Sequence, residues 1–263
     1  MEILVCVKSV PDSADNDIEV NAAGSDIERS DLVYTVNEWD NYAMEEAIRI
    51  RDKVGGSVTV ATVGDADSED VLRREMAMGA DNAALLCDEA FQGADGRGIA
   101  TILKAAAEMS GYDLILTGAQ AEDGAGQVGG MLAALLGYPY VALVNEIEVL
   151  GDGRLKVGRE IEGGAQEINE ITLPCVLSIQ TGINEPRYVG IRGIRKVASV
   201  EFPRCTAADL GLDPAVAGAA GARVRRLDYF VPPAGRGAEM LQGSSEQIIV
   251  QLIERLKANG GLR

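Results

Sequence analysis

Short aliphatic runs alternate with amphipathic segments through the first half of the chain, and this alternation constrains the fold more than any other feature. The apolar runs occupy residues 3–7, 57–64, 83–87 and 113–118. Amphipathic segments with helical spacing occupy residues 42–51, 68–78, 99–109 and 128–136. Near-continuous apolar runs are typical of strands in a parallel sheet that is covered on both faces. We therefore expect an α/β fold, a mostly parallel, Rossmann-like sheet with helices on both faces.

The pattern changes after Pro139. Three further strands are expected at 141–149, 154–161 and 174–180, and the turn Gly151-Asp152-Gly153 indicates a β-hairpin extension. From Asn184 onward the sequence is less periodic, until a helical pattern at 245–257 that Ser244 or Ser245 would cap. We divide the chain into an α/β domain at 1–183 and a segment at 184–263. We interpret the latter as an arm that wraps a partner, the alternative being an extension packed on its own chain.

Composition excludes several functions. The chain has 263 residues, a formal charge of −17, 47% hydrophobic residues and no histidine. The hydrophobic content supports a sizeable core, while the acidity disfavours binding to nucleic acid or to an anionic membrane. Without histidine there is no Ser-His-Asp triad, imidazole base or histidine-containing metal site. An enzyme of this composition would have to rely on Lys, Asp, Glu, Tyr or Cys; the alternative is that the chain holds a cofactor and performs no acid–base chemistry of its own. No metal site is predicted.

The cysteines indicate a reducing compartment. Cys6, Cys87, Cys175 and Cys205 stand far apart, and the first three lie in or beside apolar runs. We interpret them as small buried thiols, which favours the cytoplasm. The N-terminal apolar run is too short for a signal or a membrane span, so no direct membrane insertion is expected.

A glycine-rich segment at residues 116–130 is the richest candidate for ligand binding. It lies between an expected strand and an expected helix, at the edge of the sheet where open α/β sheets bind ligands. Glycine allows close backbone approach, and free N–H groups at a helix N-terminus suit a phosphate. Neither GxGxxG nor GxxxxGK[ST] is present, so the alternative is a loop that only turns the chain. The ends of the first two strands, at Lys8 and Gly64, could complete a nucleotide pocket.

Two other segments have competing interpretations. Trp39, the only tryptophan, stands just before an expected helix and could contact a ligand or form a hydrophobic staple on that helix. The acidic run at residues 12–17 lacks EF-hand spacing, so we expect a solvated surface loop there.

Taken together, motifs along nearly the whole chain resemble the beta subunit of electron-transfer flavoprotein. They occupy residues 7–12, 37–47, 76–81, 116–121, 126–129, 159–164, 173–174 and 184–188. The resemblance implies a subunit of an alpha–beta heterodimer. In this family the redox-active FAD sits mainly in the alpha subunit, and the beta subunit binds a second nucleotide, AMP in ordinary members and a second FAD in electron-bifurcating ones. Partners implied are the alpha subunit, flavin dehydrogenases such as acyl-CoA dehydrogenases, and a quinone oxidoreductase or other downstream acceptor.

Carried over residue by residue, the family's nucleotide pocket falls on the strand ends selected above. Its residues here are Cys6, Asn37, Glu38, Trp39, Asp40, Val63, Gly118, Ala119, Gln120, Ala121, Asp123, Gly124, Ala125, Gly126, Gln127 and Val128. The family's docking loop follows Asn184-Glu185-Pro186-Arg187-Tyr188. Its aliphatic anchor corresponds to Ile191, flanked by Tyr188 and Ile194; the alternative is that Ile191 packs on the protein's own sheet.

This sequence departs from the family pattern at the glycine-rich loop. The usual Asp-Gly-Asp-Thr-Gly-Gln reads Asp123-Gly124-Ala125-Gly126-Gln127, which is one residue shorter and lacks a hydroxyl. Asp40 and Tyr42 look closer to the bifurcating members, which take hydride from NADH. The leading hypothesis is an electron carrier, and a bifurcating flavoprotein is the alternative. A nucleotide-sensing or ATP-handling module is a third class, disfavoured by the missing Walker lysine.

Overall fold

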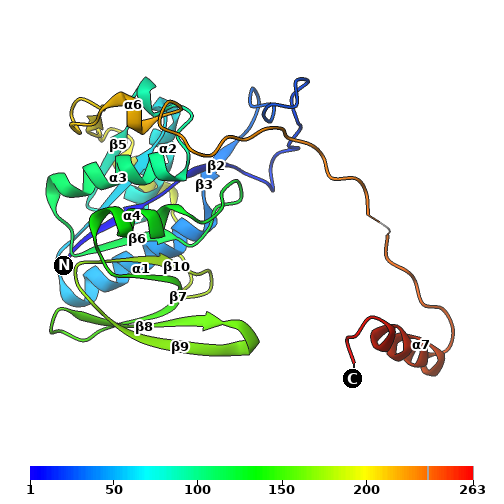
Figure 1. Ribbon diagram of the computed structural model, residues 1–263. Helices are drawn as coiled ribbons and strands as arrows, with labels where there is room; N and C mark the ends of the chain where they lie inside the picture. The colour runs from blue at the N-terminus through cyan, green and yellow to red at the C-terminus, as the bar shows by residue number, and fades with distance from the viewer. Residues whose placement is uncertain (236, 263) are drawn as a thin grey trace.

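A nine-stranded sheet with helices on both faces forms the body of the protein in this computed structural model, which describes residues 1–235 and 237–262 (Figure 1). The strand order is β11-β5-β4-β1-β6-β10-β7-β8-β9. The strands from β11 to β7 are parallel, while β8 and β9 continue the sheet in antiparallel pairing. The expected α/β fold with a mostly parallel sheet is confirmed.

The parallel strands are β1 (Glu2–Cys6), β4 (Ser57–Val63), β5 (Asn82–Leu86), β6 (Leu114–Gly118), β7 (Tyr140–Val149), β10 (Cys175–Ile179) and β11 (Arg204–Cys205). The antiparallel extension consists of β8 (Arg154–Ile161) and β9 (Ala165–Thr172). A separate small ribbon pairs β2 (Ser9–Pro11) with β3 (Tyr34–Val36).

The principal helices are α1 (Glu38–Val54), α2 (Glu69–Met78), α3 (Gly96–Ser110), α4 (Val128–Leu136), α5 (Ile191–Val197), α6 (Pro214–Ala217) and α7 (Ser245–Ala258). Short 3-10 turns lie at Ala66–Ser68, Glu89–Phe91 and Glu162–Gly164. Among residues 1–235 and 237–262, no helix has both the length and the apolar composition that crossing a membrane requires.

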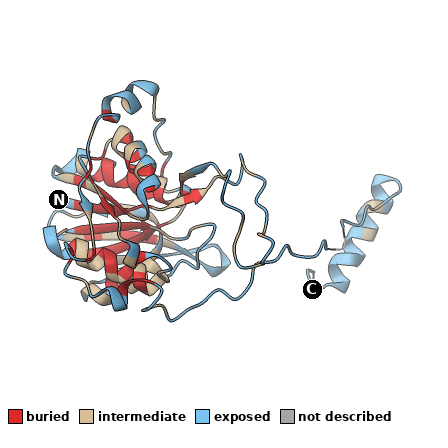
Figure 2. Ribbon diagram, turned by 90° about the horizontal axis from the view of Figure 1, so that it is seen from above, coloured by how far each residue is buried: buried red, intermediate tan, exposed pale blue. Residues whose placement is uncertain are grey.

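Alternating side chains of the sheet divide the core into two clusters. Ile3 and Val5 of β1 point to the cluster that includes α1 and α2, and Leu4 points to the one that includes α3 and α4. Period-two alternation in a strand buried on both faces produces this division. Figure 2 shows the resulting buried layer through the body.

The edge strand β9 was not predicted from the sequence. The interpretation placed only a turn between the strands at 154–161 and 174–180, whereas β9 pairs with β8 along its whole length. Most of its side chains are exposed and polar, and Ile171 is the buried one. A solvated edge strand lacks the apolar run that reveals a strand.

The chain from residue 184 has two portions. Residues 184–219 pack on the body: β11 pairs with β5, and Phe202, Ala207 and Ala217 are buried. Residues 223–229 still contact the body, and beyond them the chain extends away and ends in α7, which stands apart from the body (Figure 1).

Candidate functional site

The candidate site lies where the parallel strands β1, β4 and β6 end. The chain runs from β1 to β4 and β5 on one side and then places β6 on the other side of β1. The strand order therefore reverses between β1 and β6, and crevices beyond such switch points are where open α/β sheets bind ligands. The N-terminal turn of α1 and the 119–127 loop both reach this edge, since Asp40 and Asn37 of α1 contact residues 118 and 120.

The Asp40 side chain links the segment that follows β1 to the last residue of β6. One carboxylate oxygen accepts the Lys8 N–H at 2.8 Å and the other accepts the Gly118 N–H at 2.9 Å. Asp40 is only 5% exposed, and burial raises the pKa of its carboxyl to about 7 against hydrogen bonds from Asn37, Gly118 and Lys8. Its two oxygens are thus engaged by this chain's own backbone, so the geometry gives Asp40 a positioning role.

Asn37 leaves a buried acceptor at the same place. Its side-chain amide donates to the Gln120 carbonyl at 2.9 Å, and its backbone N–H donates to the Lys8 carbonyl at 2.9 Å. The residue is 1% exposed, yet Oδ1 has no hydrogen-bond partner in the described part of the chain. Buried polar atoms without partners are uncommon and costly, so this oxygen suits a donor from a ligand.

Trp39 and Gly118 pack tightly together. A Cβ on Gly118 would lie 2.4 Å from Asp40 Oδ1 and 2.7 Å from Trp39 Cβ, so only glycine fits. Because α1 begins at Glu38, Trp39 occupies its second position, whereas a staple uses the residue before the cap and the fourth helical residue. The staple interpretation of Trp39 is therefore wrong.

The exposed glycine-rich loop leads into α4, whose N-terminus lacks a side-chain cap within the described structure. Gly126 has φ +63°, and a Cβ there would lie 2.8 Å from the Ala119 carbonyl oxygen. Gln127, the residue before α4, makes no side-chain capping bond within the described structure. Residues 122–127 are exposed. The first N–H groups of α4 therefore have no side-chain cap among the described residues and suit an anion; ligand binding at Gly126, Gln127 and Val128 stays a prediction.

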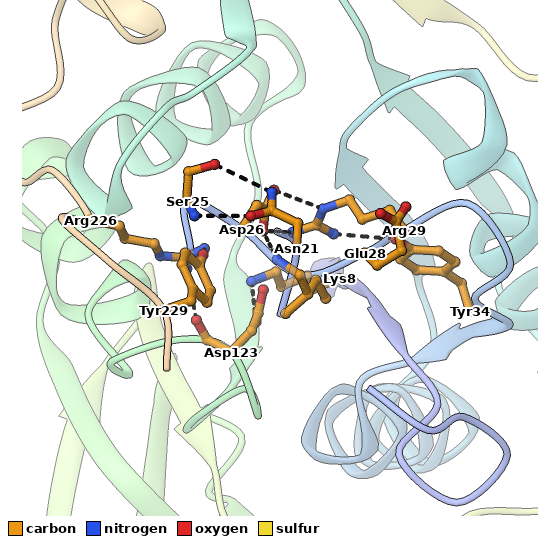
Figure 3. A network of polar contacts seen from close by, with 11 residues as sticks. Lys8, Asn21, Ser25, Asp26, Glu28, Arg29, Tyr34, Asp123, Arg226 and Tyr229 are labelled. Carbon is orange, nitrogen blue, oxygen red and sulfur yellow. Dashed lines mark hydrogen bonds and ion pairs between the residues drawn. The ribbon is translucent and has the colours of Figure 1, made fainter. Parts of the chain in front are cut away.

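Two basic residues approach this loop: Lys8, at a strand end that the sequence analysis selected, and Arg226, which it did not include (Figure 3). Lys8 Nζ lies 2.5 Å from Asp123 Oδ1, and Arg226 Nη2 donates to the Asp123 carbonyl at 2.9 Å. Arg226 also donates to the Tyr229 hydroxyl at 2.7 Å, and the Tyr229 N–H donates to the Gly24 carbonyl at 2.8 Å. Residues 223–229 of the C-terminal arm therefore cross the glycine-rich loop at residues 119–127. The sequence signal was a cluster of arginines in an acidic chain.

The other predicted pocket residues take varied positions at this edge. Cys6 is buried in β1, where burial raises the pKa of its thiol. Val63 ends β4 and is partly buried, while Glu38, Asp123, Gly124 and Ala125 are exposed. Ala119 N–H donates to the Ile179 carbonyl at 2.9 Å, which ties the loop to β10. The structure thus brings three strand ends and α1 together, with the distal part of the loop in solvent.

The cysteines are all unpaired, and all four lie in the described residues. Cys6 and Cys175 are buried, as expected, but Cys87 is only partly buried, because it follows the last residue of β5. Within residues 1–235 and 237–262, no group of three or more His, Cys, Asp or Glu residues could hold a metal. Asp12 of the acidic run accepts the Ala14 N–H at 3.0 Å in an exposed turn.

The predicted docking residues are exposed. Tyr188 is 91% exposed, Ile191 68% and Ile194 49%. Ile191 begins α5, a helix that the sequence interpretation did not include. The alternative that Ile191 packs on the protein's own sheet is contradicted by this exposure.

Comparisons with known proteins agree with these observations. The family model described as "Electron transfer flavoprotein domain" matches residues 26–210. The chain is 38% identical to "Electron transfer flavoprotein subunit beta" of Thermoanaerobacterium thermosaccharolyticum, over 98% of both chains. It is 36% identical to the protein of the same name from Methylophilus methylotrophus, over 98% of this chain and 99% of the other. It is 35% identical to "Caffeyl-CoA reductase-Etf complex subunit CarD" of Acetobacterium woodii, over 98% of both. The chain belongs to the family of electron transfer flavoprotein beta subunits.

Proposed function

We propose that this chain is the beta subunit of a heterodimeric electron carrier and that it binds a structural AMP at the switch point beside β1. The observation that carries the proposal is the buried Asn37 Oδ1, which has no partner among the described residues. Asn37 contacts Gln120, in the loop that leads to the N-terminus of α4, where the described residues provide no side-chain cap. A purine amino group could donate to such an acceptor, and the α4 N-terminus suits a phosphate. Lys8 and Arg226 would add positive charge at the phosphate end. FAD, held mainly by the alpha subunit, would supply the redox chemistry.

The arm supports the heterodimer proposal. Residues 223–229 lie on the body, while α7 presents exposed apolar side chains: Ile249, Val250, Leu252, Ile253 and Leu256. An amphipathic helix normally buries such residues. We propose that the alpha subunit covers them, so that residues 184–263 form a docking and wrapping unit beside the nucleotide-binding domain at 1–183. The unpaired cysteines support a cytoplasmic location.

We propose that Tyr188, Ile191 and Ile194 dock flavin dehydrogenases such as acyl-CoA dehydrogenases, and that electrons then pass to a quinone oxidoreductase or another acceptor. The support for this docking role is the high exposure of Ile191 and Ile194 on the short helix α5 and of Tyr188 just before it. A few desolvated anchor residues carry most of the binding energy of an interface. The test is Ile191→Ala in the purified heterodimer, with an acyl-CoA dehydrogenase as the electron donor. The KM for the heterodimer should rise with AMP and FAD content unchanged. Met109→Ala, also exposed, is the matched control. Unchanged coupling in Ile191→Ala would refute the docking proposal.

The electron-bifurcating alternative rests on Asp40 and Tyr42. In the structure Asp40 holds the Lys8 and Gly118 N–H groups, and the Tyr42 carbonyl accepts from Asn184. The Asp40 contacts explain that residue without a second flavin, which favours AMP, whereas the Tyr42 contact involves only its backbone carbonyl and favours neither ligand. Two FAD per heterodimer together with NADH oxidation would reverse this preference.

A further inference from the structure

The segment that carries the proposed docking residues is fixed to the body at its entrance by a buried carboxylate. Glu45 of α1 accepts three hydrogen bonds from Arg187: from Nε at 2.7 Å, from Nη2 at 3.0 Å and from the backbone N–H at 3.1 Å. The Glu45 side chain is 6% exposed. Burial pushes its pKa upward, but the hydrogen bonds and charge of Arg187 outweigh burial, and the net pKa is lowered. A forked pair of this kind fixes both direction and distance.

The neighbouring carboxylate of α1 holds the same segment. Asn184 donates to Glu46 Oε2 at 3.0 Å and to the Tyr42 carbonyl at 3.1 Å. Asn184 is 9% exposed. Thus Asn184 and Arg187 are both attached to one face of α1, and Tyr188 follows directly after the second attachment.

The exit of the segment is held by α2. Arg73 Nη1 donates to the carbonyl oxygens of Val197, Ala198 and Val200 at 3.0–3.2 Å, where α5 ends. Glu69 orients Arg73 through a 3.0 Å contact. A cation at these carbonyls also complements the helix dipole. Gly193 allows α5 to lie against α2, because a Cβ there would come 3.0 Å from the Ala77 carbonyl oxygen.

We infer that Glu45 and Arg73 are positioning residues for dehydrogenase docking: they clamp the two ends of the segment so that Tyr188, Ile191 and Ile194 face solvent in one fixed arrangement. This inference rests on the docking proposal above. Preorganisation of an exposed anchor reduces the ordering cost of association, so the clamp acts on affinity. Glu45 lies on α1 about two turns after Asn37, the residue that precedes the helix at its nucleotide-site end, so its effect should be separable from nucleotide binding.

The test uses the purified heterodimer with an acyl-CoA dehydrogenase as the electron donor. Glu45→Gln and Arg187→Gln should each raise the KM for the heterodimer roughly tenfold, with kcat at saturation and the AMP and FAD content unchanged. The double variant should be no worse than either single variant, because both remove the same contact. Trypsin should cleave faster after the exposed Arg192, Arg195 and Lys196. Arg73→Gln, which opens the other end from another helix, should also raise KM.

Arg49→Gln is the matched control. Arg49 lies 3.5 Å from Glu45 Oε1 but is 52% exposed and belongs to α1 itself, so KM and cleavage should match the wild type. If Ile191→Ala raises KM while Glu45→Gln and Arg73→Gln do not, the clamp is refuted and docking stands. If Ile191→Ala also leaves KM unchanged, both proposals fail. Loss of nucleotide or an equal fall in kcat in the clamp variants would show a general structural role and refute the inference.

Discussion

The helices α1 and α7 have similar lengths and opposite surroundings. α1 has 17 residues, of which eight are buried between the sheet and neighbouring elements. α7 has 14 residues, all within the described part of the chain, and none is buried. Figure 2 shows the contrast between the buried body and the exposed arm.

This contrast separates local from tertiary causes of helix formation. Ser244 and Gln247 form a capping box, so the start of α7 is specified locally. A solitary helix of this length is only marginally stable in water, and most helical stability comes from packing. Asn37, the N-cap residue of α1, by contrast makes no side-chain capping bond among the described residues, and α1 is stabilised by burial. The body is thus folded by its own core, and the exposure of α7 agrees with our proposal that a partner surface covers it.

The largest expected effect comes from making α7 polar. The double variant Ile249→Asp, Ile253→Asp removes two exposed aliphatic side chains one turn apart. If the alpha subunit buries them, heterodimer affinity should fall by more than ~100-fold, at about 1.5–3 kcal/mol for each side chain. Thermal unfolding of the isolated variant should match the wild type. Analytical ultracentrifugation measures the affinity of the two subunits. An intact heterodimer of the double variant would contradict the proposal that the alpha subunit buries these α7 side chains.

The next effect concerns the body's close packing at the candidate site. Gly118→Ala places a Cβ 2.4 Å from Asp40 Oδ1 and should cost about 1–3 kcal/mol of unfolding free energy, with loss of bound nucleotide. Gly124→Ala is the control, because its Cβ would meet nothing nearer than Ala121 Cβ at 3.6 Å. Urea denaturation and nucleotide release distinguish the two. Equal tolerance of both substitutions would contradict the tight contact between α1 and β6.

Glu75 gives the body a distinctive pH dependence. It is fully buried, both carboxylate oxygens lack partners in the described residues, and burial raises its pKa to about 8. The folded chain therefore retains a proton that the unfolded chain loses above its ordinary pKa. The contribution of Glu75 to the free energy of unfolding is fully present below pH ~4.3. It falls by ~1.4 kcal/mol per pH unit as the pH rises toward 8. Glu75→Gln should reduce that slope in urea titrations at pH 5, 7 and 9. Identical slopes would refute the assignment to Glu75.

The smallest effect is expected where the arm crosses the loop. Arg226→Ala removes the hydrogen bond to the Asp123 carbonyl and should weaken AMP binding by ~3–10-fold, since an exposed charged contact contributes about 1 kcal/mol. The loss should diminish at high salt. Arg225→Ala is a neighbouring control. Calorimetry with AMP-depleted heterodimer measures the AMP affinity of both variants. If Arg226→Ala binds AMP as tightly as the wild type, the arm does not contribute to nucleotide binding.

The sequence predicted the parts of the molecule that have local or periodic signals. Apolar runs revealed the parallel strands other than the two-residue β11, and Gly118 and Gly126 marked the loop at their ends. β9 escaped because its residues are polar, and α5 because Gly193 and several charges interrupt its apolar pattern. The contacts of Lys8, Arg226 and Glu45 join residues far apart in the chain. The spacing of residues along one sequence does not specify which distant side chains come into contact.

The cofactor content of the purified heterodimer tests the central claim most directly. The chain would be co-expressed with its alpha subunit, denatured, and the released FAD and AMP quantified per heterodimer. We expect one FAD and one AMP. Two FAD without AMP would replace the carrier by the bifurcating alternative. One FAD with no second nucleotide would contradict a ligand site at Asn37 and the α4 N-terminus.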